Sequence, residues 1–176
     1  MDKGVVLITG GASGIGFAVA AQLGRAGYTV AVLGRNTQSG RQAATALCDL
    51  GIDAVGDGAD FSNYAEVASL RERLGPLSEP EILVCSAGVM SEKMSKTLRT
   101  APDELDRVLG VNVLGVVNAL AHFAPPMVAA RSGKVIALSA CLGRFSGPGT
   151  SGGLAPYRVS KAAVNALIRN FAAETG

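Results

Sequence analysis

The chain has 176 residues, of which 48% are hydrophobic and 17% are charged, which is enough apolar material for one well-buried domain and too much for a disordered chain. The formal net charge is only +2 and no lysine or arginine run is long enough to follow a phosphate backbone, so we expect neither a nucleic-acid partner nor attraction to an acidic membrane. The apolar run before the first glycines is too short for a signal peptide or a membrane span, which predicts a cytoplasmic protein without a membrane partner.

The cysteines and the histidine do not favour a disulfide framework or a metal site. Cys48, Cys85 and Cys141 are odd in number and lack C-x-x-C spacing, and His122 is the only histidine. We therefore predict no bound metal. Cys85 is interpreted as a small buried thiol rather than a reactive one.

Short β-branched runs alternate along the chain with longer alanine-rich segments of helical period. This alternation predicts parallel β-α-β units, with helices over both faces of one sheet. We therefore expect residues 1–176 to form one α/β domain, a doubly wound parallel sheet in a three-layer α/β/α arrangement. The strands are predicted at Val5–Thr9, Thr29–Leu33, Ala54–Gly56, Ile82–Cys85 and Val135–Ser139.

The first predicted strand leads directly into the glycine-rich sequence TGGASGIG, Thr9 to Gly16. Glycines permit a tight turn and a close backbone approach, and a helix that begins after Gly14 directs its free N–H groups toward a pyrophosphate. Between a strand and a helix, Gly10, Gly14 and Gly16 therefore predict a dinucleotide-binding turn. A turn that serves packing alone is the alternative.

The second predicted strand ends in the sequence VLGRN. Gly34 stands where an acidic residue would hold a ribose 2′-hydroxyl, and Arg35 follows it. Because a guanidinium suits a 2′-phosphate, the sequence favours NADP(H) over NAD(H). The alternative is that Arg35 is only a solvated loop cation.

A long central helix is predicted in TAPDELDRVLGVNVLGVVNAL. It begins with a capping-box-like spacing from Thr100 to Asp103 and continues with apolar residues at helical period. Asn112 lies within it, and because asparagine is only a middling helix former, a functional role is favoured there. Farther along, the Gly-, Ser- and Pro-rich stretch between Cys141 and Tyr157 predicts a loop at the rim of a substrate site.

The stretch APYRVSKAAVNALI places Tyr157 four residues before Lys161, so both lie on one helical face. A neighbouring cation favours the phenolate, which makes a tyrosine hydroxyl more useful as a proton donor and acceptor near neutrality. By itself this spacing is consistent with a catalytic pair and with a surface pair.

Taken in series, TGGASGIG, DFS, SAG, VNVLG and YRVSK resemble the short-chain dehydrogenases/reductases, and NVLG with PYRVSKAAVNAL is similar to their carbonyl-reductase-like members. The resemblance covers essentially the whole chain. It implies a single-domain Rossmann fold, hydride transfer between NADP(H) and a small carbonyl or alcohol substrate, and assembly as a homo-oligomer. It also implies a set of cofactor contacts: the phosphates at Gly10, Ser13, Gly14, Ile15 and Gly16, the adenine at Asp60 and Phe61, and the adenosine ribose side at Ala87 and Gly88.

The same resemblance implies the roles of the catalytic residues. Tyr157 would be the proton donor. Lys161 would hold the nicotinamide ribose and lower the pKa of Tyr157, and Asn112 would fix a water in the proton relay. The helices that hold Asn112 and Tyr157 would pack against their counterparts in a partner subunit.

Two features depart from the family's pattern. An ungapped comparison puts Ala140 where a serine usually polarises the substrate carbonyl, and its neighbour Ser139 would point to the opposite face unless the strand slips or bulges. Loss of one such donor costs about 10²–10³ in rate, so we expect impaired activity. The sequence also ends with the helix of Tyr157, so the family's last strands are expected to be absent and the fifth strand to be an exposed edge.

Two alternatives to an oxidoreductase remain. Ala140 and the missing strands favour a non-catalytic dinucleotide-binding or dimerisation module, whereas Tyr157, Lys161 and Asn112 favour an enzyme. A methyltransferase-like nucleotide binder is less favoured, because its glycine loop does not predict the pairing of tyrosine with lysine.

Overall fold

A computed structural model describes residues 3–91, 96–146 and 152–176 of the chain. Within them, five parallel strands form one sheet in the order β3-β2-β1-β4-β5, the order of the first five strands of a Rossmann sheet, which confirms the predicted fold class. β1 and β4 have the predicted bounds, β2 and β3 extend slightly farther, and β5 ends two residues earlier. The strands are β1 Val5–Thr9, β2 Thr29–Gly34, β3 Ala54–Gly58, β4 Ile82–Cys85 and β5 Lys134–Ala137.

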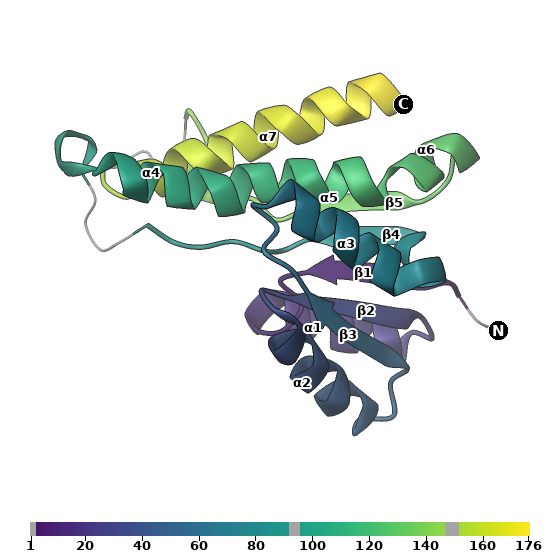
Figure 1. The fold of residues 1–176 in the computed structure, drawn as a ribbon. Helices are drawn as coiled ribbons and strands as arrows, with labels where there is room; N and C mark the ends of the chain where they lie inside the picture. The colour runs from purple at the N-terminus through teal and green to yellow at the C-terminus, as the bar shows by residue number, and fades with distance from the viewer. Residues whose placement is uncertain (1–2, 92–95, 147–151) are drawn as a thin grey trace.

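Helices connect these strands and cover both faces of the sheet (Figure 1). Among the described residues, none of the helices is long and apolar enough to cross a membrane. The α-helices are α1 Gly14–Arg25, α2 Thr37–Cys48, α3 Tyr64–Leu74, α4 Pro102–Leu109, α5 Gly115–Phe123, α6 Pro125–Ala130 and α7 Ala155–Thr175. The short 3-10 and π segments are η1 Gly75–Ser78, η2 Thr97–Arg99, η3 Gly110–Leu114 and η4 Cys141–Gly143.

Alternate residues of the buried strands supply the two apolar cores. On β1, Val6 and Ile8 belong to the core under α1 and α2, whereas Leu7 belongs to the core under α3, α5 and α7. All three side chains are completely buried. Successive side chains of a strand point to opposite faces, so an uninterrupted apolar run produces a sheet covered on both sides.

The predicted central helix exists, but its start and its regularity differ from the prediction. α4 begins at Pro102 with Ala101 as the N-cap and no capping side chain, so the capping box at Thr100 was wrong; the Thr100 hydroxyl donates to the carbonyl of Lys96 instead. Between α4 and α5, η3 is a π-helical segment, which widens the helix around Asn112. Single π turns inside α-helices frequently occur at functional sites.

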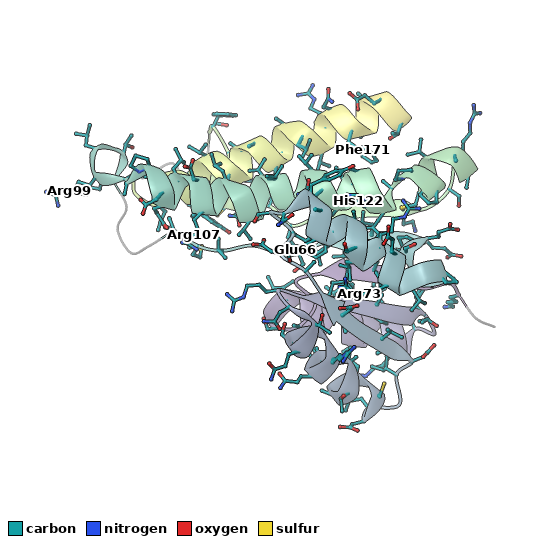
Figure 2. The ribbon with its side chains drawn as sticks, in the orientation of Figure 1. Glu66, Arg73, Arg99, Arg107, His122 and Phe171 are labelled. Carbon is teal, nitrogen blue, oxygen red and sulfur yellow. The ribbon has the colours of Figure 1, made fainter. Side chains whose placement is uncertain are left out.

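β5 lies at one edge of the sheet, as predicted. Its residues alternate between exposed and half-buried, and Ile136 on this strand is 47% exposed. At the opposite edge of the sheet, Nε of Arg73 lies 2.9 Å from Oδ2 of Asp57 on β3. Figure 2 labels Arg73 on α3. An ion pair therefore connects the edge strand β3 to α3, whereas the edge strand β5 contacts the helical layer through the half-buried Val135 and Ala137.

Candidate active site

The glycine-rich turn lies at the carboxyl end of β1, and its three motif glycines serve different purposes. A Cβ on Gly10 would come within 2.7 Å of the backbone of Ala87, and a Cβ on Gly16 would collide with the carbonyl of Gly10. Gly14 has a φ of +55° and a Cβ there would meet nothing within 4 Å. Gly10 and Gly16 thus permit close packing, Gly10 (φ +66°) and Gly14 both adopt a left-handed backbone, and the space above Gly14 is open.

The first turn of α1 faces this open space. Ser13 is the N-cap with an extended backbone and makes no side-chain capping bond, and both Ser13 and Ile15 are exposed. The first N–H groups of an α-helix have no partner within the helix, and they carry the positive end of its dipole. The turn therefore offers free donors at the position that the sequence predicts for phosphates.

The end of β2 shows why a carboxylate is absent there. A Cβ on Gly34 would collide with the hydroxyl of Ser39 and approach the backbone nitrogen of Gly40 to 2.7 Å. Ser39 holds this position because it forms a capping box with Asn36 at the start of α2. Next to this cap, Arg35 is exposed. The structure therefore has no room for an acidic side chain at Gly34 and presents a cation beside it.

The residues predicted to contact adenine follow β3. Asp60 is exposed, and its carboxylate Oδ1 accepts hydrogen bonds from the backbone N–H and the hydroxyl of Ser62, at 2.9 and 2.7 Å. The side chain of Phe61 is buried in the core, and its carbonyl accepts a 2.8 Å bond from Asn118. A contact from Phe61 to a nucleotide is therefore limited to its backbone.

The loop after β4 adjoins the glycine turn on one side and the Tyr157 helix on the other. The N–H of Ala87 donates to the hydroxyl of Thr9, and Gly88 is exposed. A Cβ on Gly88 would lie 3.3 Å from Oδ1 of Asn112 and 3.7 Å from Nζ of Lys161. The structure thus brings together three segments that are far apart in sequence.

Asn112 lies in the π segment, and its side chain is fully buried. Oδ1 accepts from the N–H of Val89 at 2.7 Å, and Nδ2 donates to the carbonyl of Val89 and to the hydroxyl of Ser160, both at 2.9 Å. Only one lone pair of Oδ1 is left for another donor. A relay water at this side chain would therefore be an internal water.

Tyr157 and Lys161 lie together on the first turns of α7, as their spacing predicts. Nζ of Lys161 is 5.6 Å from the centre of the Tyr157 ring and donates a 2.8 Å hydrogen bond to the carbonyl of Leu138. Lys161 is 6% exposed and Tyr157 is half-buried. The ammonium is thus oriented by the end of the fifth strand.

The pKa of Tyr157 differs from the prediction in direction. Burial, with a smaller contribution from the nearby Cys141 thiol, raises the pKa of Tyr157 above its ordinary value. Burial also lowers the pKa of Lys161. The expected lowering of the Tyr157 pKa by Lys161 is not found, and desolvation of the phenolate is the main cause of the rise.

The residues after β5 correct the predicted strand. Because β5 ends at Ala137, Ser139 lies beyond the strand, and the argument from alternating faces does not apply to it. The Ser139 hydroxyl donates to the backbone carbonyl of Lys161 at 3.3 Å, and Ala140 is the N-cap of η4. Of the predicted substrate rim, residues 147–151 lie outside the described residues.

Two further residues complete the arrangement. The Ser160 hydroxyl accepts a hydrogen bond from Nδ2 of Asn112, and the sequence did not lead us to expect a role for it. Its spacing of three residues from Tyr157 places both on one helical face, which was the signal in the sequence that could have identified it. Cys85 is 2% exposed, and burial raises its pKa to about 12. This confirms the interpretation of Cys85 as a structural thiol.

The glycine turn, the Tyr157–Lys161 pair and the strand order agree with the result of the family comparison. Residues 4–176 match the short chain dehydrogenase family. The chain belongs to the short-chain dehydrogenase/reductase family. Members of this family use NAD(P)(H) and are oxidoreductases.

Two relatives and one solved structure illustrate the match. Glycine betaine reductase of Emericella nidulans is 36% identical over 97% of this chain, and C alpha-dehydrogenase of Sphingobium sp. is 36% identical over 95% of it. A solved short chain dehydrogenase/reductase family protein superposes with a TM-score of 0.86 at 30% identity, over 99% of this chain. The chain spans 13% and 54% of the lengths of the two relatives and 69% of the solved chain.

The residues present fit a dinucleotide of this type. The open space at Gly14 and the exposed start of α1 suit phosphates, and exposed Gly88 beside Lys161 offers a second close approach for a ligand. Both lie at the carboxyl ends of β1 and β4, where the strand order reverses and ligands bind in open parallel sheets.

Proposed function

We propose that this chain is an NADP(H)-dependent reductase of small carbonyl compounds, in which Tyr157 supplies the proton. The observation that supports this most directly is that Lys161 and Asn112 both approach Gly88, next to the glycine turn, while the ring centre of Tyr157 lies 5.6 Å from the Lys161 ammonium. These groups come from α7, the π segment and the loop after β4. Such an arrangement is costly to maintain, because it buries the Lys161 ammonium against a neutral backbone carbonyl.

In this proposal, the phosphate-binding turn consists of Gly10, Ser13, Gly14, Ile15 and Gly16. Arg35 binds the 2′-phosphate, Asp60 and the backbone of Phe61 contact the adenine, and Ala87 and Gly88 flank the ribose. Lys161 binds the second ribose. The bound cofactor supplies a hydride to the carbonyl carbon of the substrate.

Tyr157 donates the proton in the proposed reaction. Its raised pKa keeps the phenol protonated near neutral pH, so that its hydroxyl can donate a proton to a carbonyl oxygen. A tyrosine at its ordinary pKa of about 10 is also protonated there, and the phenol takes the proton back in the reverse reaction, so this pKa does not set the working direction.

The carbonyl-polarising donor is the weakest part of the site. Ser139 is the nearest hydroxyl in sequence to the expected position, and it already donates to the carbonyl of Lys161. It can serve only if that bond is exchanged for one to the substrate. Ala140 therefore favours the second candidate function, a dinucleotide-binding or dimerisation module without turnover.

Assembly and location belong to the same proposal. Leu114 and Val117 are exposed three residues apart near Asn112, at 45% and 38%, and Val159 on α7 is 52% exposed. These apolar side chains support a homo-oligomer that packs through α5 and α7. We also propose a cytoplasmic location.

The test is NADPH oxidation with a panel of small aldehydes and ketones, comparing Tyr157→Phe with the original protein. The variant should lose at least about 10² of the rate while keeping its NADPH affinity, because it removes a proton donor and preserves shape. Tyr64→Phe is the matched control, since Tyr64 is exposed on α3. An unchanged rate in Tyr157→Phe would exclude Tyr157 as the acid, and NADPH binding with no turnover would favour the non-catalytic module.

A further inference from the structure

Ser160 lies on α7 between Tyr157, the proton donor of the proposed reaction, and Lys161, the proposed ribose ligand. It directly precedes Lys161 and is completely buried. Its hydroxyl donates to the backbone carbonyl of Tyr157 at 2.7 Å and accepts from Nδ2 of Asn112 at 2.9 Å. The direction of both bonds is fixed, because a carbonyl can only accept and an amide NH₂ can only donate.

The two hydrogen bonds of Ser160 connect α7 to the π segment and, through Asn112, to the loop after β4. Asn112 holds both the N–H and the carbonyl of Val89, in the loop after β4. Through Ser160 the same amide reaches the first turn of α7, which packs on α4 and the π segment (Figure 1). In an α-helix the carbonyl of Tyr157 also accepts the N–H four residues later, that of Lys161. The backbone carbonyl of Tyr157 thus accepts hydrogen bonds from both the Ser160 hydroxyl and the Lys161 N–H.

A serine hydroxyl bonded to the carbonyl three residues back is by itself an ordinary feature of helices. Ser78 shows this bond elsewhere, to the carbonyl of Gly75, also at 2.7 Å and also buried. Ser78 precedes the amino end of β4, and the site lies at the carboxyl ends of the strands, at the opposite end of the sheet. What distinguishes Ser160 is the second bond, from a buried amide that is itself bound to the loop beside Gly88.

We propose that Ser160 is a positioning residue that fixes Tyr157 relative to Asn112 and the loop after β4. The proposal rests on the function proposed above, because it concerns the alignment of the same acid. Removing the hydroxyl leaves a hydrogen of the wholly buried Asn112 amide without its partner. The amide and the first turn of α7 then lose their shared anchor, and the phenol loses its fixed orientation.

The experiment compares Ser160→Ala, Ser160→Thr and the matched control Ser78→Ala in the full chain. The first readout is the ultraviolet titration of the Tyr157 phenol, obtained by difference against Tyr157→Phe, with circular dichroism recording folding at each pH. Ser160→Ala should move this titration toward the ordinary tyrosine value of about 10, because a loosened turn admits water. Ser160→Thr and Ser78→Ala should leave it in place.

The second readout is NADPH-dependent reduction of the aldehyde or ketone on which the original protein is fastest. Ser160→Ala should lower kcat by about 10–100-fold, as expected for a misplaced acid, with the KM for NADPH within about twofold. A Tyr157 titration that is unchanged in Ser160→Ala, or shifted equally by Ser160→Thr, would overturn the inference. If the original protein shows no turnover but the titration shifts as expected, the proposed reaction fails and the positioning of Tyr157 by Ser160 stands.

Discussion

The preference for NADPH over NADH should depend on Arg35, and Arg35→Ala should narrow it. Arg35 is exposed where β2 ends, beside the start of α2. Among the described residues, no hydrogen bond or ion pair engages its guanidinium. The adjacent cap is already occupied, because Oδ1 of Asn36 accepts from the N–H of Ser39. Arg35 is therefore the charged group available to a 2′-phosphate.

The size of the effect follows from this exposure. A hydrogen bond to a charged group contributes about 1.5–3 kcal/mol, and a solvent-exposed pair lies at or below the lower end because water and salt screen it. A loss of about 1.4 kcal/mol corresponds to a tenfold change in Kd. We therefore expect Arg35→Ala to weaken NADPH binding by about tenfold and NADH binding by less than about twofold. The NADPH preference should also decrease as the salt concentration rises.

The assay is a fluorescence titration with each reduced nucleotide at fixed salt. The chain contains no tryptophan, so the nicotinamide emission can be followed with little protein fluorescence beside it. Arg25→Ala is the matched control, since Arg25 is an exposed cation at the other end of α1. Equal affinities for both nucleotides in the original protein would refute the reasoning, as would an equal loss of both in Arg35→Ala.

A companion variant tests the steric half of the same argument. Gly34→Asp introduces the carboxylate that NAD(H) enzymes use, but its Cβ would meet the Ser39 hydroxyl and the Gly40 backbone. We expect a loss of about 1–3 kcal/mol in the free energy of unfolding, as for other overpacked sites, and no gain in NADH affinity. Urea unfolding with an NADH titration measures both. A stable variant that binds NADH more tightly would show that the space is adaptable.

Three further outcomes are expected. Ala140→Ser should raise the reductase rate, by up to about 10²–10³ if the new hydroxyl is correctly aimed; no increase would mean that Ser139 or another group already polarises the carbonyl. Burial alone would raise the pKa of Asp57, but hydrogen bonds, chiefly from Arg73, lower it to about 2, so the stability that the pair adds above about pH 4 should be lost as pH falls toward about 2. Because Arg73 is 45% exposed, Asp57→Asn should lower the free energy of unfolding in urea at neutral pH by only about 1 kcal/mol. An acid unfolding transition that is the same in Asp57→Asn and in the original protein would contradict this prediction. Sedimentation at micromolar concentration should show a dimer or larger assembly that Val117→Glu weakens by at least about tenfold, whereas a monomeric original protein would contradict the proposed packing.

The fold was predictable because its signals are local. Buried parallel strands have near-continuous apolar runs, so β1 and β4 were predicted with their observed bounds. Strand ends were harder, since β5 stops at Ala137 where the chain turns into η4, and no residue type marks that point. The capping box at Thr100 was wrong for a related reason: Pro102 fits the first turn of a helix without any capping side chain.

The π segment shows the limit of periodicity. The apolar residues of α4 and α5 follow one helical pattern, and a widened turn between them shifts the pattern too little to be detected. Asn112 was singled out by its residue type, but its partners could not be foreseen. They are the backbone of Val89 and the hydroxyl of Ser160, from segments 23 and 48 residues away.

The pairing of Tyr157 with Lys161 was predictable from an i, i+4 spacing, whereas its electrostatics were not. The sequence places the charges four residues apart, but how far each is desolvated depends on the loops that cover them, and desolvation decides the direction of the Tyr157 pKa. The partner of the Lys161 ammonium is the carbonyl of Leu138. Backbone carbonyls are present at every residue, so no sequence pattern identifies this one.

These backbone partners also explain why the fold and the candidate site depend on each other. The Lys161 ammonium, the Ser139 hydroxyl and the Asn112 amide all bond to main-chain groups of other segments. Backbone groups move only when their segments move, so each bond ties a site residue to the register of β4, β5 or α7. A buried donor that loses such a partner incurs its full desolvation cost. Substitutions here are therefore expected to change stability and alignment together, which is why cofactor affinity and the Tyr157 titration must be measured beside turnover.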